Sequence, residues 1–501
     1  MLSTHRIQEP PTDFVGRSSR AAERRVQPIV SGSFRRVKRV AGSALVAASG
    51  LVVLDLLSWI AIYAAATAIR GDAFFTTPLQ FVFIGALQFA VIAALLFIIG
   101  AYNRETEMRG LSYMTEHVLA VIAAAAISAF LVYSAATFDE TMKPSRSALA
   151  LSFVAFLPLS IAYRRAIRAA FWAATANRAF LVVGSGELAA EFYRAYKKSP
   201  NRQRLEFVDV ARARVGEHIA GPGSPIIEAD LATKLERLGD RYSGVIIAER
   251  VDRLRPELLD QLVRTQFHET RVYTLESFHE AHWRHVPVHA LDPFWPLQMG
   301  FQLARNSPYH YLKRLFDLAL AGVLLVISSP LFAVIAFAIW RENGGPVIFR
   351  QLRVGRDDEP FTIFKFRTMF SPTDDAEGEI YTRRGDPRIT RVGRWLRKLR
   401  LDELPQLINV LRGEMSLIGP RAEWTVCAER YEKVIPFYHF RHLVKPGITG
   451  WAQVNYPYGE SDEDAIEKLK YDLYYIRNYS LKLDVMIVLK TVHTMLFGKG
   501  Q

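Results

Sequence analysis

Four long apolar stretches dominate the first third of the chain, at 41–69, 79–102, 117–137 and 147–163. Each is close to the ~20 residues that an α-helix needs to cross a bilayer. Helices buried in a globular core carry an apolar stripe on one side, whereas these stretches are apolar all round. The pattern therefore predicts a membrane protein with a bundle of four transmembrane helices over 41–170. Asp55 is expected to face neighbouring helices, because a carboxylate in contact with lipid is costly.

Basic residues around these stretches indicate the orientation of the bundle. The first forty residues are rich in arginine and contain no apolar segment, so they indicate a disordered cytoplasmic tail over 1–40 and not a cleavable signal. The second connection contains Arg104 and Arg109, and Arg164 and Arg165 close the fourth stretch, while the other two connections are less basic. Since basic loops stay in the cytoplasm, both ends of the bundle are predicted to lie there.

After Arg178 the pattern changes to short apolar runs that alternate with helical periodicity. Strands are expected at about 179–184, 205–210, 244–248 and 271–275, with a helix at 187–198. This alternation predicts a small α/β domain of Rossmann-like type over 178–300.

The first predicted strand of this domain ends in a glycine-containing turn, Gly184-Ser-Gly186. Backbone amides at such a helix start can bind a pyrophosphate, and Asp209 follows the next strand, where an acid could bind a ribose. The same turn is also a compact connection between a strand and a helix, and a lone glycine fingerprint is weak evidence. The sequence leaves open whether this domain binds a nucleotide, regulates the protein or forms a homodimer.

A fifth apolar stretch, at 318–340 within a predicted membrane helix of about 313–341, differs from the other four. Basic residues flank it on both sides, among them Lys313 and Arg341, so a full crossing would place many positive charges outside. Ser329 and Pro330 interrupt its centre, where proline removes a backbone donor and bends a helix, and serine hydroxyls can bond the freed carbonyls. The pattern favours a re-entrant helix that enters and leaves by the cytoplasmic face. An ordinary kinked span is the alternative.

The composition indicates a polyanionic partner but does not identify which kind. Half of the 501 residues are apolar and the formal net charge is +13. Nucleic acid, anionic lipid headgroups and phosphorylated substrates would all suit this charge. The only cysteine, Cys427, excludes an intrachain disulfide and a cysteine-built zinc site.

Two adjacent carboxylates, Asp402 and Glu403, are the strongest candidates for chemistry. Pro405 follows them, which suits the first turn of a helix, and a helix N-terminus stabilises an ionised carboxylate and attracts phosphate. A carboxylate can attack phosphorus to form an acyl phosphate, and its neighbour can hold Mg²⁺. The ordinary alternative for such a pair is a helix cap.

Arginines surround this pair in the sequence, and guanidinium groups match phosphate oxygens. Some of them recur at helical spacing opposite an apolar face, which indicates a helix in the membrane interface. A second amphipathic helix, predicted to dock at the interface, lies at 481–497. The arginines before the pair are Arg388, Arg391, Arg394, Arg397 and Arg400, those after it are Arg421 and Arg441, and the apolar face comprises Val392, Trp395, Leu396 and Leu399.

From Tyr309 onward the chain resembles the bacterial sugar transferase family of monotopic polyprenyl-phosphate hexose-1-phosphate transferases. One departure is Ala422, where many members have proline. The four spans and the α/β domain also resemble the longer members, with weaker signatures. The matching motifs are Lys313-Arg314-Leu-Phe-Asp317, Ser329-Pro330, Phe364-Lys365-Phe366-Arg367-Thr-Met369, Asp386-Pro-Arg388-Ile-Thr390-Arg-Val-Gly393, Leu401-Asp402-Glu403-Leu-Pro-Gln-Leu407, Gly419-Pro420-Arg421 and Lys445-Pro-Gly-Ile-Thr-Gly-Trp-Ala-Gln-Val454.

The resemblance implies a mainly α-helical monotopic catalytic domain over 308–501, in a bacterial inner membrane and facing the cytoplasm. It implies transfer of a hexose-1-phosphate, from UDP-glucose or UDP-galactose, to undecaprenyl phosphate in exopolysaccharide or lipopolysaccharide O-antigen assembly, without a nucleic-acid partner. Asp402 would be the nucleophile, and Glu403 with Asp402 would hold Mg²⁺. The residues expected to bind phosphate are Lys365, Arg397, Arg421 and Arg441.

Two other functions are alternatives to a sugar-phosphate transferase. A membrane-anchored nucleotide-sugar dehydratase also joins several spans to a dinucleotide fold, but it needs a long Rossmann domain with a correctly placed Tyr/Lys pair. Tyr193 and Lys197 fall too early in the domain for that geometry. A non-catalytic scaffold would be favoured by loss of Asp402 or Arg421, and both are present.

Overall fold

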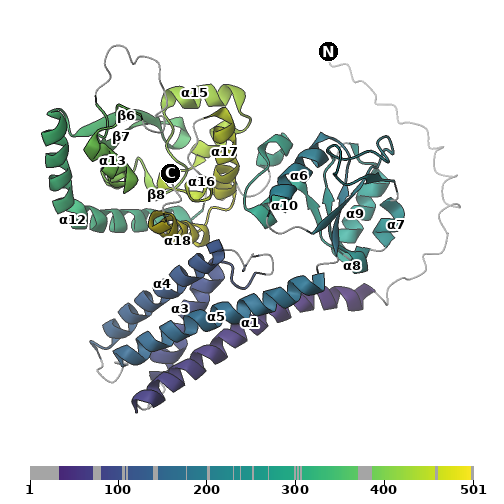
Figure 1. Cartoon of the computed structure of the whole chain (residues 1–501), viewed down its shortest axis with the longest axis horizontal. Helices are drawn as coiled ribbons and strands as arrows, with labels where there is room; N and C mark the ends of the chain where they lie inside the picture. Colours follow the sequence, from purple (N-terminus) through teal and green to yellow (C-terminus); the bar gives the residue numbers. More distant parts are fainter. Residues whose placement is uncertain are drawn as a thin grey trace, which may run out of the picture.

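The computed structural model describes residues 33–497 with several gaps, and Figure 1 shows the whole chain. Most of the predicted basic tail and the connection residues Arg104 and Arg109 lie outside the described residues. The residues outside the description are 1–32, 72–79, 104–105, 107, 109–110, 139–144, 176–177, 200–202, 230, 237, 251–252, 269, 298–300, 302–303, 305–306, 371–385, 457–460 and 498–501.

The N-terminal bundle contains α1 (Ser33–Arg70), α3 (Leu87–Ile98), α4 (Leu111–Ala135) and α5 (Arg146–Thr175). Within the described residues, four helical segments are long and apolar enough to cross a membrane: Ser49–Ile69, Tyr113–Ala135, Arg146–Ala170 and Tyr309–Glu342. Three of them confirm predicted spans, and the fourth is the stretch predicted to be re-entrant.

Two predicted boundaries in this region need correction. Helix α1 begins at Ser33, so residues 33–40 are helical and do not belong to a disordered tail. The second predicted span contains an α-helix of only 12 residues, α3, which continues from a π-helical segment, Phe81–Ala86. Apolar composition alone does not distinguish the π-helical part from the α-helical part.

A buried ion pair lies inside the bundle. The Arg164 guanidinium on α5 donates to both carboxylate oxygens of Asp55 on α1, at 2.5 and 2.7 Å, and neither side chain is exposed. The Tyr102 hydroxyl donates to the same carboxylate at 2.7 Å. These contacts confirm that Asp55 faces neighbouring helices, where its charge is paired and need not meet lipid.

The next domain contains a five-stranded parallel sheet in the order β3-β2-β1-β4-β5. Strand β1 is buried along its whole length, as expected for a parallel sheet covered on both faces. Four strands occur close to their predicted positions, while β3 was missed because two residues carry too little pattern. The strands are β1 (Ala179–Val183), β2 (Arg204–Val208), β3 (Ile227–Glu228), β4 (Tyr242–Ile247) and β5 (Val272–Thr274), and the helices are α6 (Glu187–Lys198), α7 (Leu231–Glu236), α8 (Leu238–Arg241), α9 (Pro256–His268) and α10 (Leu275–Phe278).

The glycine turn after β1 has a packing role. Gly184 has φ +129°, and a Cβ there would lie 2.6 Å from the carbonyl oxygen of Ala248. Only glycine fits this backbone contact. The Asp209 carboxylate accepts hydrogen bonds from the backbone amides of Ala211 and Arg214, at 3.0 and 2.8 Å. Asp209 therefore stabilises its own loop. At Gly186, a Cβ would lie 3.9 Å from the Glu249 carboxylate.

The C-terminal part is built around α12 (Tyr309–Asn343) and a two-stranded antiparallel hairpin of β6 (Ile348–Val354) and β7 (Pro360–Phe366). A short parallel pair, β8 (Ser416–Ile418) and β9 (Gly447–Thr449), lies among the remaining helices. These helices are α13 (Arg391–Lys398), α14 (Gln406–Arg412), α15 (Thr425–Val434), α16 (Trp451–Asn455), α17 (Asp462–Arg477) and α18 (Leu481–Phe497).

Helix α12 is continuous but sharply bent, and Figure 1 shows its two arms meeting at an angle. Pro330 lies inside it and cannot donate to the carbonyl of Val326, four residues earlier. The Ser329 hydroxyl donates to that carbonyl at 2.8 Å. The bend is therefore stabilised locally by the serine that precedes the proline.

Helix α18 joins the C-terminal part to the bundle. The Lys490 ammonium forms an ion pair of 3.3 Å with Glu116 on α4, and the Lys482 ammonium lies 4.5 Å from the centre of the Phe97 ring on α3. Leu489 packs into the apolar core of the bundle. The polar face of α18, from which docking at the membrane interface was predicted, thus contacts protein.

Candidate active site

The first turns of α12 anchor the site through a buried carboxylate on α18. Asp484 accepts hydrogen bonds from the Lys313 ammonium and the Tyr309 hydroxyl on α12, both at 2.6 Å. It also accepts one from the Tyr475 hydroxyl on α17, at 2.9 Å. Helix α12 is therefore held at one point to the consecutive helices α17 and α18, and the lysine of the predicted Lys-Arg motif has a structural role.

The next motif residue, Arg314, contacts the helix that follows the carboxylate pair. Its guanidinium donates to the carbonyls of Val410 and Leu411 in the last turn of α14, at 2.5 and 2.9 Å. Carbonyls at a helix C-terminus have no intrahelical partner, and a cation there complements the helix dipole. Asp317 completes the motif by accepting the amide of Leu417 at 3.0 Å.

The carboxylate pair lies one turn earlier than predicted. Asp402 and Glu403 belong to a 3₁₀ turn, Leu401–Glu403, and α14 begins only at Gln406. Pro405 is the N-cap of α14, and Arg400 before the turn has φ +55°. This left-handed residue reverses the chain after α13, so that the two carboxylates face β7.

Glu403 is held by two cations. Its Oε1 accepts from the Lys365 ammonium at 3.3 Å and from the Arg421 guanidinium at 3.1 Å, and only 8% of the side chain is exposed. Burial on its own raises the pKa of this carboxyl, but the charges of Arg421 and Lys365 outweigh burial and lower the pKa to about 2. Glu403 is therefore an anion at any physiological pH.

Asp402 has a different environment although it is adjacent. Its carboxylate makes no hydrogen bond or ion pair within the described part of the chain. Burial and the negative charge of Glu403 raise its pKa, and the nearby Lys365, Arg397 and Arg421 only partly oppose this. A carboxylate that is not engaged in an ion pair keeps its lone pairs for reaction. The structure therefore separates a fixed anion, Glu403, from an unengaged one, Asp402.

Three of the four predicted phosphate ligands surround the pair. Lys365 and Arg421 contact Glu403 directly, and burial lowers the pKa of Lys365 to about 8. Arg397 on α13 donates through Nε to the Thr368 hydroxyl at 3.0 Å and is close enough to lower the pKa of Asp402.

Arg441 lies behind Arg421 and not beside the carboxylates. Its guanidinium, 6% exposed, donates to the backbone carbonyl of Arg421 at 2.9 Å and to the Asp472 carboxylate at 3.1 Å. It also contacts the Tyr438 hydroxyl. These contacts make Arg441 a positioning residue for Arg421.

Asn409 is a residue that the sequence reasoning missed. Fully buried on α14, it accepts the amide of Phe364 at 3.1 Å and donates to the carbonyl of Thr362 at 2.7 Å. It thereby fixes α14 to β7, the strand that carries Lys365. The sequence signal that could have identified Asn409 was its amide side chain on the apolar face formed by Leu407 and Val410.

Glu342 was also missed, and it positions α13. Its carboxylate accepts the amides of Arg391 and Val392, at 2.7 and 3.0 Å, at the start of that helix. Gly393 permits close packing, because a Cβ there would lie 2.1 Å from the Thr368 carbonyl oxygen. Of the predicted apolar face of α13, Trp395 is 66% exposed, whereas Leu396 is buried against Ile335 and Ile339 of α12, so only part of this face is available to a membrane interface.

Comparison with known proteins shows the family of this chain. The model of the bacterial sugar transferase family matches residues 308–498. An exopolysaccharide production protein of Rhizobium leguminosarum is 40% identical over 195 residues, which cover 38% of this chain and 98% of that protein. The chain belongs to the bacterial sugar transferase family.

Two longer members are also similar to this family member. A UDP-glucose:undecaprenyl-phosphate glucose-1-phosphate transferase of Escherichia coli is 46% identical over 284 residues, covering 55% of this chain and 60% of that protein. A UDP-N-acetylgalactosamine-undecaprenyl-phosphate N-acetylgalactosaminephosphotransferase of Aeromonas hydrophila is 41% identical over 260 residues, covering 52% and 60%. The matched part spans about three fifths of the length of each of these two relatives.

The carboxylate pair, Asp402 and Glu403, offers the oxygen ligands that Mg²⁺ prefers. Mg²⁺ prefers oxygen ligands and commonly uses one or two carboxylates together with substrate phosphates and water. Asp402 is unengaged, and both ion pairs of Glu403 use Oε1. Within the described residues, the one group of three potential metal ligands is Asp358, Glu432 and His442, which excludes the pair. A cation on the pair would therefore need phosphate oxygens or water to complete its coordination.

Proposed function

We propose that this protein transfers a hexose-1-phosphate from a UDP-hexose to a polyprenyl phosphate, with undecaprenyl phosphate as the acceptor. The observation that carries the proposal is the pairing of an unengaged carboxylate, Asp402, with a neighbour held by Lys365 and Arg421. The printed names of the Escherichia coli and Aeromonas relatives describe the same class of transfer.

The reaction proceeds in two displacements at phosphorus. A carboxylate oxygen of Asp402 attacks the sugar-linked phosphorus, the bond from that phosphorus to the bridging oxygen breaks, and UMP leaves with the electron pair. An oxygen of the polyprenyl phosphate then attacks the same phosphorus, and the bond to Asp402 breaks. The products are UMP and a polyprenyl diphosphate sugar, and the Asp402 carboxylate is regenerated.

The cations around the carboxylate pair stabilise the negative charge that comes together when the carboxylate approaches the diphosphate. An anionic nucleophile and an anionic diphosphate repel each other, and preorganised positive groups reduce this repulsion. Lys365 and Arg421 are already fixed on Glu403, so they need little reorganisation to contact phosphate oxygens. Arg397 approaches from the α13 side.

Asp402 and Glu403 are the residues that would hold Mg²⁺. The ion would supply positive charge on the diphosphate oxygens of the donor. Glu403 suits this role because it stays ionised, its pKa being lowered to about 2.

The same proposal assigns the membrane arrangement. Helix α12 is re-entrant, the upstream sheet is Rossmann-like, and the catalytic part faces the cytoplasm of a bacterial inner membrane. Supporting observations are the bend at Pro330 bridged by Ser329 and the strand order β3-β2-β1-β4-β5. In Figure 1 the catalytic part and the sheet lie on the same side of the bundle, which supports assigning both to one face of the membrane.

The hexose is glucose or a related sugar, and the product begins a lipid-linked glycan of the exopolysaccharide or O-antigen type. Product analysis tests this. The detergent-solubilised protein is incubated with Mg²⁺, undecaprenyl phosphate and a panel of UDP-sugars, and the lipid product is identified by mass spectrometry. We expect a polyprenyl diphosphate hexose from the wild type and none from Asp402→Asn with equal membrane insertion. Absence of any lipid-linked sugar from well-folded wild type would contradict the proposal.

A further inference from the structure

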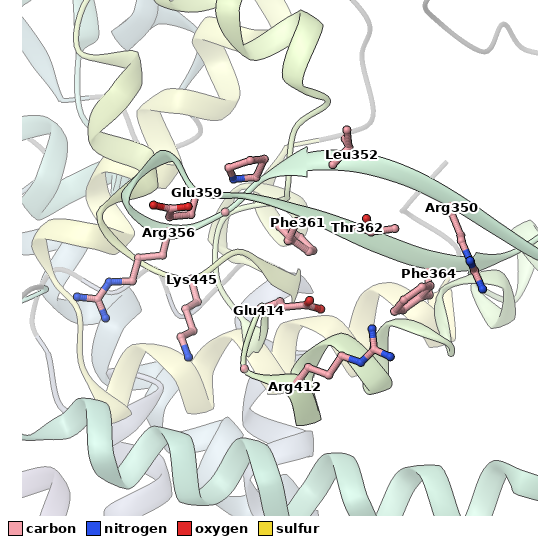
Figure 2. A pocket seen from close by; sticks show the side chains of 13 residues that line it. Arg350, Leu352, Arg356, Glu359, Phe361, Thr362, Phe364, Arg412, Glu414 and Lys445 are labelled. Carbon is pink, nitrogen blue, oxygen red and sulfur yellow. The ribbon is translucent and has the colours of Figure 1, made fainter.

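A basic cavity beside the β6–β7 hairpin is lined by residues other than the carboxylate pair. It encloses about 700 Å³ between the hairpin, the end of α14 and the segment before β9 (Figure 2). Its charged lining comprises Arg350, Arg356, Arg412, Lys445, Glu359 and Glu414.

The lining of this cavity differs from the residues of the candidate active site. On β7, Phe361, Thr362 and Phe364 line the cavity, whereas Lys365 contacts Glu403. Asp402, Glu403 and Arg421 do not contribute to the lining. The cavity is therefore a site of its own.

Two cations of this cavity, Arg412 and Lys445, have no acidic partner among the described residues. The Arg412 guanidinium lies over the Phe364 ring, 4.9 Å from its centre, and makes no hydrogen bond or ion pair with any residue that the structure describes. The Lys445 ammonium likewise has no such bond within the described ranges. Of the two acids, Glu414 already accepts a hydrogen bond from Asn409 at 2.7 Å. Figure 2 shows the Arg412 and Lys445 side chains beside the cavity.

Positive charge is crowded at the Lys445 end. A Cβ on Gly413 would lie 3.3 Å from the Arg314 guanidinium and 3.5 Å from the Lys445 ammonium, so these two groups converge on one point. Burial, together with Arg314 and Arg356, lowers the pKa of Lys445. An anion bound between these groups would relieve their repulsion.

The surroundings of the cavity are apolar and exposed. Leu352 in its wall is 55% exposed. Arg314, which converges on its floor, lies on α12 next to Leu315 and Phe316, which are 64% and 54% exposed. These apolar side chains belong to the segment Tyr309–Glu342, which is long and apolar enough to cross a membrane. A basic pocket beside such a surface suits a lipid headgroup.

We propose that this cavity binds the phosphate of an anionic membrane phospholipid, with Arg412 and Lys445 as its principal ligands. The lipid is a structural ligand and takes no part in the transfer. Guanidinium and ammonium groups recognise phosphate by charge-assisted hydrogen bonds. The lipid tails would extend over the exposed face of α12.

Thermal unfolding of the full-length protein in a neutral detergent tests this proposal. Phosphatidylglycerol is titrated against phosphatidylcholine and against inorganic pyrophosphate, which separates an anionic lipid from a zwitterionic lipid and from free phosphate. We expect phosphatidylglycerol to raise Tm at concentrations where the other two do not. Equal stabilisation by pyrophosphate, or by phosphatidylcholine, would overturn the assignment to an anionic lipid.

Matched variants locate the effect. Arg412→Gln with Lys445→Gln should weaken the apparent affinity for phosphatidylglycerol by about tenfold or more, since each lost charge-assisted bond is worth that order. Arg430→Gln with Lys433→Gln makes the same charge change on the exposed surface of α15 and should leave the affinity unchanged. Arg412→Gln alone, at an exposed side chain without hydrogen bonds, guards against misfolding. Equal losses in both pairs would refute the site.

Discussion

The Arg441 guanidinium donates a hydrogen bond of 2.9 Å to the backbone carbonyl of Arg421. Because Arg441 is also fixed by Asp472, at 3.1 Å, it holds the backbone from which the Arg421 side chain reaches Glu403. A buried arginine behind the site thus controls an arginine within it. Burial raises the pKa of Asp472 to about 6 even beside this guanidinium, so the pair is strongly desolvated.

Arg441→Lys keeps the charge but loses the fork that reaches two acceptors at once. We expect the free energy of unfolding to fall by about 1.5–3 kcal/mol, because a buried charged group loses a partner. We also expect kcat to fall more than the affinity for donor changes, because Arg421 is misplaced and not removed. Denaturant unfolding and steady-state kinetics measure both quantities. Arg430→Lys, on the surface, is the control, and an unaltered kcat in Arg441→Lys would remove the positioning role.

The pH profile should show a basic limb set by Lys365. Its pKa is lowered to about 8 by burial, so the ammonium that contacts Glu403 is lost as pH rises through that value. Activity should therefore fall above about pH 8. Since the pKa in the unfolded chain is 10.5, the unfolded state binds more protons between the two values, and the contribution of Lys365 to stability rises with pH there.

Lys365→Arg tests this assignment, because guanidinium stays charged across the range. The variant should keep measurable activity and move the basic limb to higher pH. A limb that stays near pH 8 in this variant would belong to another group.

The C-terminal part should fold without the bundle. All three partners of Asp484, namely Tyr309, Lys313 and Tyr475, lie within 305–501. A truncation to 305–501 should retain transferase activity in detergent. Its Tm should be lower, because Leu489 and Lys490 lose their contacts with the bundle. A well-folded truncation without activity would show that upstream residues contribute to the site.

If α12 is re-entrant, as proposed, its bend leaves the C-terminus in the cytoplasm. Reporter tags at Glu342 and Gln501 should both report the cytoplasm. Replacing Ser329 and Pro330 by leucines restores the backbone hydrogen bonds of a straight apolar helix. Part of the population should then place its C-terminus outside and lose activity. A wild-type C-terminal tag that reports the periplasm would contradict the re-entrant arrangement.

Sequence patterns sufficed for features with a local signature. The bend at Pro330, the burial of Asp55 and the strands around the glycine turn depend on residue type and periodicity. Lys365 and Arg421 were expected at the site only from family motifs, as phosphate ligands, because β7 and the Gly-Pro-Arg segment are far apart in the chain. Their common contact with Glu403 was not predicted. The sequence could not show that Asp402 stays unengaged.

Other features depend on tertiary partners that no local pattern reveals. Arg441 has the composition of a phosphate ligand, yet its position beneath Arg421 depends on Asp472, 31 residues later. Glu342 ends α12 but stabilises α13, and Asn409 fixes a strand through its amide. Helix α18 carries an amphipathic pattern that fits lipid and protein equally well, so only the ion pair with Glu116 identifies its partner.

The covalent role of Asp402 is the centre of this account, and peptide mass spectrometry of the trapped intermediate tests it most directly. The protein is incubated with the UDP-hexose that supports turnover and with Mg²⁺, without lipid acceptor, then quenched and digested. We expect one hexose-phosphate adduct on the peptide that contains Asp402, its loss on adding polyprenyl phosphate, and none in Asp402→Asn. An adduct on another residue, or turnover by Asp402→Asn at the wild-type rate, would contradict the account.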